Sequence, residues 1–181
     1  MIKNPIKPFY DENSRILILG SFPSVKSREQ GFYYGHTQNR FWKVVAYLFD
    51  EMVPESIDEK KLLLKKCRIA LSDVVDSCDI SGSSDSSIKN VVPTDLTEIL
   101  EGAPIEKIFL NGKTAEKLYN KYIKHKISIE TAVLPSTSPA NAAWNFEKLV
   151  NEWGKIRTRP AIAIKDCDRA PGTLIVFAIK K

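Results

Sequence analysis

The feature that most constrains the fold of this 181-residue chain is a regular alternation of short apolar runs and amphipathic segments. Residues 15–20 are apolar at nearly every position, which is typical of a strand buried on both faces of a sheet. Three further strand-like runs lie at 68–75, 105–110 and 127–134. Helical patterns lie between and after them, at 39–48, 58–66, 94–101, 112–123 and beyond 140. This order predicts an α/β fold, a three-layer sandwich with a mainly parallel four-stranded central sheet.

The alternation ends near residue 158. Two strand-like runs joined by a turn-rich segment follow, which predicts a β-hairpin extension at the C-terminus. We therefore expect one domain over residues 1–158 and an extension over 159–181 that packs on the same domain. The stretch 21–38 is rich in Ser, Gly and Tyr and the stretch 77–87 is rich in Ser and Asp, and we expect both to be loops.

Charge and composition limit the possible partners. Lys and Arg number 27 and Asp and Glu 22, so the formal net charge of +5 is compatible with a polyanionic partner. The apolar runs are too short to cross a bilayer and the N-terminus lacks a signal-peptide core, so we expect a cytoplasmic protein with no membrane partner. Cys67, Cys78 and Cys167 have no C-x-x-C spacing, which favours buried, reduced thiols.

The loop after the first strand is a candidate site, because ligands of parallel sheets bind at the carboxyl ends of strands. Gly20 permits a close backbone approach and Pro23 fixes the loop direction, while Ser21, Phe22 and Ser24 complete the loop. Such a loop can aim backbone N–H groups at an anion or a carbonyl. A plain turn is the competing interpretation.

Residues 32–42 are the densest constellation in the chain. Three consecutive aromatic residues, ending at Tyr34, precede His36 in a predicted loop, and stacking on a nucleobase is one use of such a surface. His36 taken alone is more typical of a hydrogen-bonded structural imidazole. Asn39 stands where a helix N-cap is expected, just before the helical pattern begins.

Two further candidates follow the second and fourth strands. Asp73 ends an apolar strand, where a carboxylate either caps a turn or contacts a ligand. A stiff loop of hydroxyl residues between prolines can approach a phosphate backbone closely, and it comprises Pro135, Ser136, Thr137, Ser138 and Pro139. The same loop also fits a helix entry with Ser138 as the cap. By contrast, the sequence 111–114 is not a nucleotide-binding P-loop, because Lys107 occupies the position of its first glycine.

Taken together, these motifs resemble a known superfamily. Gly-x-x-Pro from Gly20 and the stretch 35–44 (GHTQNRFWKV) resemble the mismatch-specific uracil-DNA glycosylases. Three stretches are similar to the hypoxanthine-DNA (deoxyinosine) glycosylase family within the uracil-DNA glycosylase superfamily, namely 20–24, 33–36 and 134–141. Asp73-Val74-Val75-x-x-Cys78 and the sequence 82–86 also fit, so the resemblance covers about residues 10–158.

The resemblance implies a monofunctional enzyme that flips a deaminated nucleotide out of double-stranded DNA and hydrolyses its N-glycosidic bond with water, without metal or cofactor. It implies base contacts from Phe22, Tyr34, His36 and Asp73. It implies sugar and DNA contacts from the loop after the first strand and from residues 135–139, which belong to the loop 135–141 that inserts into the duplex. Base excision repair and a monomeric state are the accompanying expectations.

One departure from the superfamily pattern determines the catalytic assignment. Phe22 stands where many members carry an Asn or Asp that positions water, and an aromatic ring cannot do so. The hypoxanthine-type family shares this loss, and the resemblance gives the main role to Asn39, as water positioner or as donor to the leaving base. The alternatives are an enzyme whose main substrate is uracil, a non-catalytic nucleic-acid-binding module and, more weakly, a nucleoside-binding protein.

Overall fold

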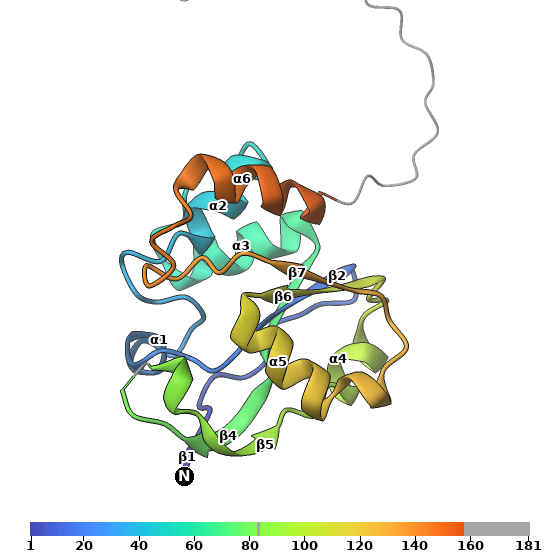
Figure 1. Ribbon diagram of the computed structural model, residues 1–181. Coiled ribbons are helices and arrows are strands. Elements are labelled where there is room, and N and C mark those ends of the chain that lie inside the picture. Colours follow the sequence, from blue (N-terminus) through green and yellow to red (C-terminus); the bar gives the residue numbers. More distant parts are fainter. Residues whose placement is uncertain (83, 158–181) are drawn as a thin grey trace, which may run out of the picture.

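Strand β2 (Ile16–Gly20) lies inside a four-stranded sheet of order β3-β2-β6-β7, in which every pairing is parallel. Its partners are β3 (Ile69–Asp73), β6 (Lys107–Asn111) and β7 (Thr131–Leu134). The structure is a computed structural model that describes residues 1–82 and 84–157 (Figure 1). The parallel four-stranded sheet is the one that the alternating sequence pattern predicts.

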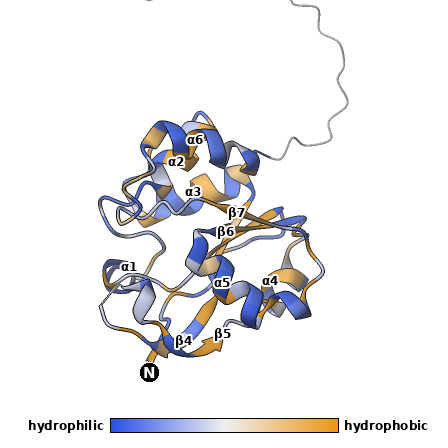
Figure 2. Cartoon of the chain, viewed as in Figure 1, coloured by the Kyte–Doolittle hydropathy of each residue, from blue (hydrophilic) through white to orange (hydrophobic). Residues whose placement is uncertain are grey.

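Helices cover both faces of this sheet (Figure 1). One layer contains α2 (Phe41–Leu48), α3 (Ile57–Cys67) and α6 (Phe146–Trp153), and the other contains α4 (Thr97–Gly102) and α5 (Lys113–Tyr122). Ile16 and Ile18 of β2 belong to the core beneath the first layer, whereas Leu17 and Leu19 belong to the core beneath the second. Hydrophobic residues follow these two interfaces in Figure 2. The fold is therefore the expected three-layer α/β sandwich.

Local sequence explains where the helices begin. Ser56 accepts a hydrogen bond from the backbone N–H of Glu59, whose side chain accepts one in return from the Ser56 N–H, which is a capping box at the start of α3. The apolar face of α2, comprising Phe41, Val44, Val45 and Leu48, is buried as the periodicity predicts. Two short 3-10 helices are η2 (Lys124–Lys126) and η3 (Gly154–Ile156).

Two segments that the sequence predicted to be loops contain regular structure. Within 77–87, the strand β4 (Val75–Asp79) pairs antiparallel with β1 (Ile2–Lys3) and with β5 (Lys89–Pro93), forming a second sheet. The Ser- and Asp-rich composition hid β4, although Ser77 and Cys78 are buried. The 3-10 helix η1 (Asp85–Ser87) follows β4.

Within 21–38, the short helix α1 (Val25–Gln30) was also missed. The Ser24 side chain caps it by accepting a hydrogen bond from the backbone N–H of Ser27. Gly31 ends it in the left-handed conformation, with a φ of 70°. A cap and a terminating glycine were both present in the sequence, but only six helical residues lie between them.

The predicted helix entry at Ser138 is wrong. Helix α6 begins at Phe146 and its cap is Asn145, whose side chain accepts a hydrogen bond from the Lys148 N–H at 2.9 Å. The loop therefore continues to residue 144. The C-terminal hairpin, the packing of 159–181 and the state of Cys167 all lie outside the described residues. Cys67 and Cys78 are buried and free, as expected.

Candidate active site

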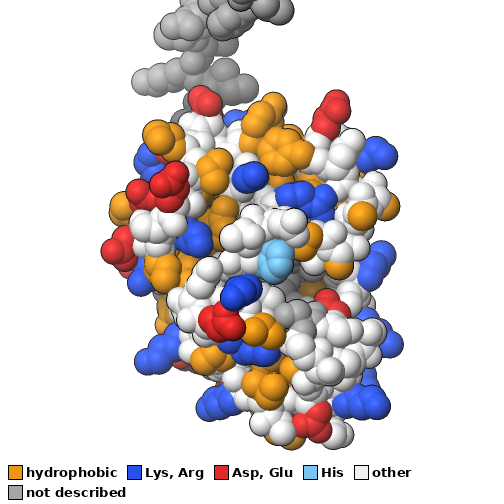
Figure 3. Space-filling model, turned by 90° about the vertical axis from the view of Figure 1, so that its left-hand side faces the viewer, with side chains coloured by type: hydrophobic (Ala, Val, Ile, Leu, Met, Phe, Trp, Pro, Cys, Tyr) orange, Lys and Arg blue, Asp and Glu red, His pale blue; other side chains and the backbone are white. Residues whose placement is uncertain are grey.

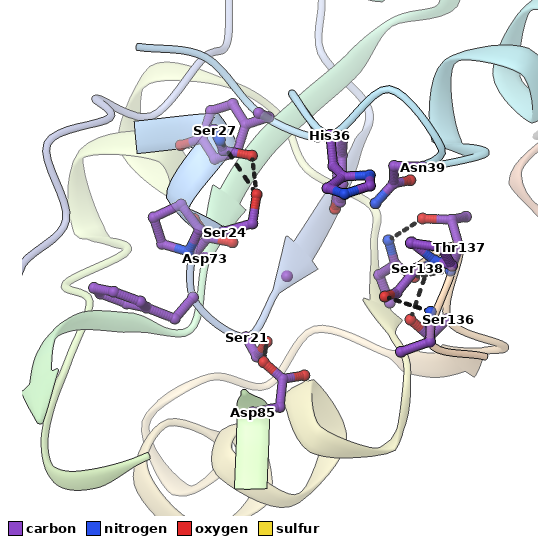
Figure 4. Close-up of a pocket in the computed structure, with 18 of the residues that line it drawn as sticks. Ser21, Ser24, Ser27, His36, Asn39, Asp73, Asp85, Ser136, Thr137 and Ser138 are labelled. Carbon is purple, nitrogen blue, oxygen red and sulfur yellow. Dashed lines mark hydrogen bonds between the residues drawn. The ribbon is translucent and has the colours of Figure 1, made fainter. Parts of the chain in front are cut away.

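A cavity of about 450 Å³ opens at the carboxyl ends of the parallel strands, between the loops after β2, β3, β6 and β7. Every residue that the sequence proposed for the site lines it, except Pro135. Figure 4 shows Ser24 and Asp73 across the cavity from the residues Ser136, Thr137 and Ser138, with His36 and Asn39 between these walls. On the face of the molecule that Figure 3 presents, a hollow is bordered mostly by side chains without charge.

The loop after β2 forms the floor of the cavity. Gly20 lies so close to Asp73 that a Cβ at this position would be 2.4 Å from Asp73 Oδ1. A glycine is therefore required by space at this position rather than by a positive φ. Phe22 borders the cavity but is only 7% exposed, and the Arg28 guanidinium lies 5.5 Å from the centre of its ring. Ser21 Oγ donates a hydrogen bond to Asp85 Oδ1 at 3.0 Å.

Tyr34 is held in an unusual backbone conformation, with a φ of 52°. Its ring stacks on Phe41 with centroids 3.9 Å apart and planes 20° from parallel. The hydroxyl is buried and makes no hydrogen bond of good geometry within the described part of the chain. Burial and the negative charge of Asp73 raise the pKa of this phenol, and the neighbouring Asn111 side chain lowers it. A positive φ at a non-glycine residue that also lines the cavity fits a binding role for Tyr34.

Asn39 serves both the helix and the cavity. Its Oδ1 accepts a hydrogen bond from the Phe41 N–H at 3.0 Å, and this contact fixes which end of the carboxamide is oxygen. The sequence predicted Asn39 as the N-cap of this helix. In the structure the N-cap is the next residue, Arg40, whose side chain makes no cap hydrogen bond. Asn39 Nδ2 points into the cavity (Figure 4) and has no partner among the described residues. It is a free donor.

His36 lies on the same wall as Asn39. Its Nδ1 accepts a hydrogen bond from the Gln38 N–H at 3.2 Å, and its carbonyl accepts one from the Asn39 N–H at 2.8 Å. The imidazole is half-buried and lines the cavity. His36 therefore shapes the turn that presents Asn39. Its position is compatible both with a structural imidazole and with a contact to a base, the two interpretations of the sequence.

Asp73 is a buried carboxyl at the end of β3, only 4% exposed. Its Oδ2 accepts a hydrogen bond from Asn4 Nδ2 at 3.1 Å, and the structure gives Oδ1 no partner among the described residues. Burial is the main cause that raises the pKa of Asp73 to about 7; the Asn4 hydrogen bond lowers this pKa, and the negative charge of Asp85 raises it further. Asp73 thus contacts a neighbour through one oxygen and leaves the other toward the cavity.

Asn111, at the end of β6, was not recognised as a site residue from the sequence. Its Oδ1 accepts from the Thr137 N–H at 3.0 Å and its Nδ2 donates to Thr137 Oγ1 at 3.1 Å. Pro135 anchors the start of the same loop, because its carbonyl accepts a hydrogen bond from Trp153 Nε1 at 2.9 Å. A polar residue that ends an apolar strand, the signal that identified Asp73, would also have identified Asn111.

Other lining residues were not proposed for the site from the sequence, although most of them lie within the stretches 33–36, 82–86 and 134–141 that carry the resemblance. Asp85 comes from η1 and reaches the cavity by its contact with Ser21. The remaining ones are Ser27, Tyr33, Ile80, Ser84, Ser86 and Ala140. No group of three or more His, Cys, Asp or Glu side chains could hold a metal ion within the described ranges. None of the described helices has the length and apolar character needed to span a membrane.

Comparison with known proteins agrees with this architecture and cavity. The profile of the uracil DNA glycosylase superfamily matches residues 7–159, and the chain belongs to this superfamily. Within it, the chain groups with the hypoxanthine DNA glycosylases, as the sequence resemblance predicted. A hypoxanthine DNA glycosylase of Methanosarcina acetivorans is 37% identical over 155 residues, which cover 84% of this chain and 96% of the relative.

A second hypoxanthine DNA glycosylase, from Methanosarcina barkeri, is 35% identical over 144 residues, which cover 78% of this chain and 89% of the relative. Among solved structures, the solution NMR structure of a candidate uracil DNA glycosylase from Methanosarcina acetivorans has a TM-score of 0.72 and 32% identity. The match covers 87% of this chain and the whole of that one. The structural comparison thus supports the fold, and the family profile and the two curated relatives support the family assignment.

Proposed function

We propose that this protein is a monofunctional DNA glycosylase that hydrolyses the N-glycosidic bond of deaminated bases in double-stranded DNA, with hypoxanthine as the main substrate and uracil as a further one. Family membership and the names of the two Methanosarcina relatives support this proposal. We further propose that the protein acts as a cytoplasmic monomer in base excision repair.

The observation that carries the proposal is the meeting of three chemical groups in one cavity. A stacked aromatic residue (Tyr34), a buried carboxyl with one free oxygen (Asp73) and a free amide donor (Asn39) face the same space. A flipped base needs a ring to stack on, a partner for its polar edge and a donor for the charge that develops as it leaves. The cavity supplies one group for each need.

The lining residues favour water as the nucleophile. No lysine belongs to the described wall of the cavity, so no amine is placed to form a Schiff base with the sugar. A monofunctional hydrolysis follows, in which water attacks C1′ as the base departs. Because Asn39 Oδ1 is engaged by the Phe41 N–H, the free Nδ2 favours donation to the departing base over activation of water.

The loop 135–139 is proposed to enter the duplex beside the flipped nucleotide. Ser136, Thr137, Ser138 and Pro139 line the cavity; Thr137 is fully buried, whereas Pro139 is exposed. Pro135 is proposed to anchor the loop rather than to contact DNA, because its carbonyl is bound to Trp153. Phosphate contacts by such a loop position the protein without reading sequence.

Single-turnover base release tests the proposal. We expect the protein, in excess over matched duplexes, to release hypoxanthine from deoxyinosine and to release uracil from deoxyuridine more slowly. Faster release of uracil would make uracil the main substrate. Salt-sensitive binding of both duplexes with no base release would contradict the enzymatic proposal and support a binding module.

Substitution of Gly20 by alanine tests the geometry of the floor. The added Cβ would meet Asp73 Oδ1 at 2.4 Å, and that carboxyl is buried and held by Asn4, so it has little room to move. We expect Gly20→Ala to slow base release by at least about tenfold and to destabilise the fold by about 1–3 kcal/mol, as overpacking does. Single-turnover kinetics and a thermal melt measure the two effects.

Gly154→Ala is the matched control. A Cβ at Gly154 would meet nothing within 4 Å, and the residue has a helical φ of −50°. We expect it to leave both base release and the melting temperature nearly unchanged. Equal behaviour of the two variants would contradict the role given to the close contact between Gly20 and Asp73.

A further inference from the structure

Arg40 makes an unusually complete set of contacts with the loop that follows β7. Its Nη2 donates to the carbonyls of Ser138 at 2.6 Å and Asn141 at 3.2 Å. Its Nη1 donates to the Trp144 carbonyl, and its Nε donates to the Thr137 carbonyl at 3.3 Å. A planar guanidinium is the side chain whose fixed donors can reach several carbonyls at once.

The backbone of Arg40 contacts the same loop. The Arg40 N–H donates to the Thr137 carbonyl at 3.1 Å, so backbone and side chain hold one oxygen together. Thr137 is fully buried and is also bound by Asn111. The loop 135–144 is thus fixed to three elements: β6 through Asn111, α6 through Trp153 and the start of α2 through Arg40.

Arg40 also follows Asn39 directly in the chain. Asn39 is held on its other side by the His36 carbonyl and by the Phe41 N–H, so Asn39 and Arg40 lie in one short, hydrogen-bonded turn before α2. A displacement of the loop 135–144 would pull on Arg40 and hence on this turn. Asn39, Arg40 and the loop 135–144 are therefore joined by a continuous set of hydrogen bonds and one peptide bond.

We propose that Arg40 is a positioning residue that couples the loop 135–144 to Asn39, so that seating of this loop in the duplex sets the position of the Asn39 donor. The catalytic part of this inference rests on the proposed function. The coupling itself is a property of the folded chain and is independent of any activity. A simple loop anchor would stabilise the loop without affecting Asn39.

Hydrogen exchange tests the coupling without reference to activity. The amide of Asn39 reports on the turn, because its partner is the His36 carbonyl and not a group of the loop. In the full-length Arg40→Ala variant we expect faster exchange both at the Asn39 amide and across 137–144. Unchanged exchange at the Asn39 amide in a folded Arg40→Ala protein would indicate a simple loop anchor and overturn the proposal.

A double-mutant cycle tests whether Arg40 acts through Asn39. At saturating enzyme, we expect Arg40→Ala to slow hypoxanthine release by about 10- to 100-fold, and Arg40→Lys to restore only part of it, because an ammonium cannot span these carbonyls. In an Asn39→Asp background, we expect Arg40→Ala to slow release less than about threefold further. Equal losses in both backgrounds would indicate a structural anchor and overturn the coupling.

Arg15→Ala is the matched control for loss of a half-buried arginine. Arg15 lies before the opposite end of β2 from Gly20, and its Nε is 3.6 Å from Glu106 Oε1. We expect this variant to retain the exchange pattern of 137–144 and the rate of base release. If the wild-type protein released no base, the proposed function would fail while the exchange result still decided the coupling.

Discussion

Replacement of Asn39 by alanine is expected to slow single-turnover release of hypoxanthine by about 100- to 1,000-fold, the effect of removing one well-placed donor from a site that stabilises developing negative charge. Asn39 Nδ2 has no partner among the described residues, and Oδ1 is engaged by the Phe41 N–H. Asn39→Ala also removes that contact, which costs about 1 kcal/mol of stability. A melt performed alongside the kinetics separates the two losses.

Asn39→Asp is the sharper variant, because aspartate keeps an oxygen for the Phe41 N–H and loses only the donor. If Asn39 donates to the departing base, Asn39→Asp should lose at least as much rate as Asn39→Ala while melting at or above the wild-type temperature. An Asn39→Asp protein that retained most of its rate would contradict donation. It would indicate that the oxygen at this position orients the attacking water.

The central sheet could be predicted from the sequence because burial on both faces of a strand leaves a short continuous apolar run. The strand β2 is buried at all five positions, and such a run fits a strand better than a helix because it is only five residues long. The second sheet left no such mark, since β5 is exposed at three of its five positions and β4 carries Asp and Ser. Its strands are held by backbone pairing with distant segments, which local composition does not encode.

The place of the candidate site could be predicted because the carboxyl ends of parallel strands lie at one edge of the sheet, where ligands bind. The sequence alone therefore placed Gly20, Asp73 and the loop 135–139 at that edge. Arg40 was missed because its importance lies in partners about 100 residues away. Asn111 was overlooked although it carries the same signal as Asp73, a polar residue at the end of an apolar strand. The role of Pro135 could not be foreseen either, because its backbone rather than its ring makes the contact with Trp153.

The protonation state of Asp73 determines which hydrogen bond its carboxyl can make with the base. Deaminated bases carry a carbonyl and a ring N–H side by side; an ionised carboxylate would repel the carbonyl, whereas a neutral carboxyl can donate to it. The groups around Asp73 favour the neutral form, because burial and the charge of Asp85 outweigh the Asn4 hydrogen bond and raise its pKa to about 7. The pKa values of the nearby hydroxyls of Tyr33 and Tyr34 are raised above the usual value for tyrosine, so both hydroxyls stay neutral.

The pH dependence of stability follows from the same shift. The native state binds the Asp73 proton up to about pH 7, whereas the unfolded chain releases it near pH 3.8. Stability contributed by this group is therefore fully present below pH 3.8 and is lost as the pH rises through about 7, by an amount on the order of a few kcal/mol. Asp73→Asn cannot ionise, so we expect it to unfold at higher denaturant concentration than the wild type at about pH 8.

Base release should follow the neutral form of Asp73. We expect the wild-type rate to fall above about pH 7, by about 30-fold at about pH 8.5, because each pH unit above the pKa reduces the protonated fraction about tenfold. Asn offers a permanent N–H donor, so Asp73→Asn should retain base release and show no alkaline fall. Asp85→Asn removes a negative charge that raises the pKa of Asp73, so its alkaline fall should begin at lower pH. A folded but inactive Asp73→Asn protein, with a wild-type rate that rises above about pH 7, would instead show that the ionised carboxylate accepts from the base N–H.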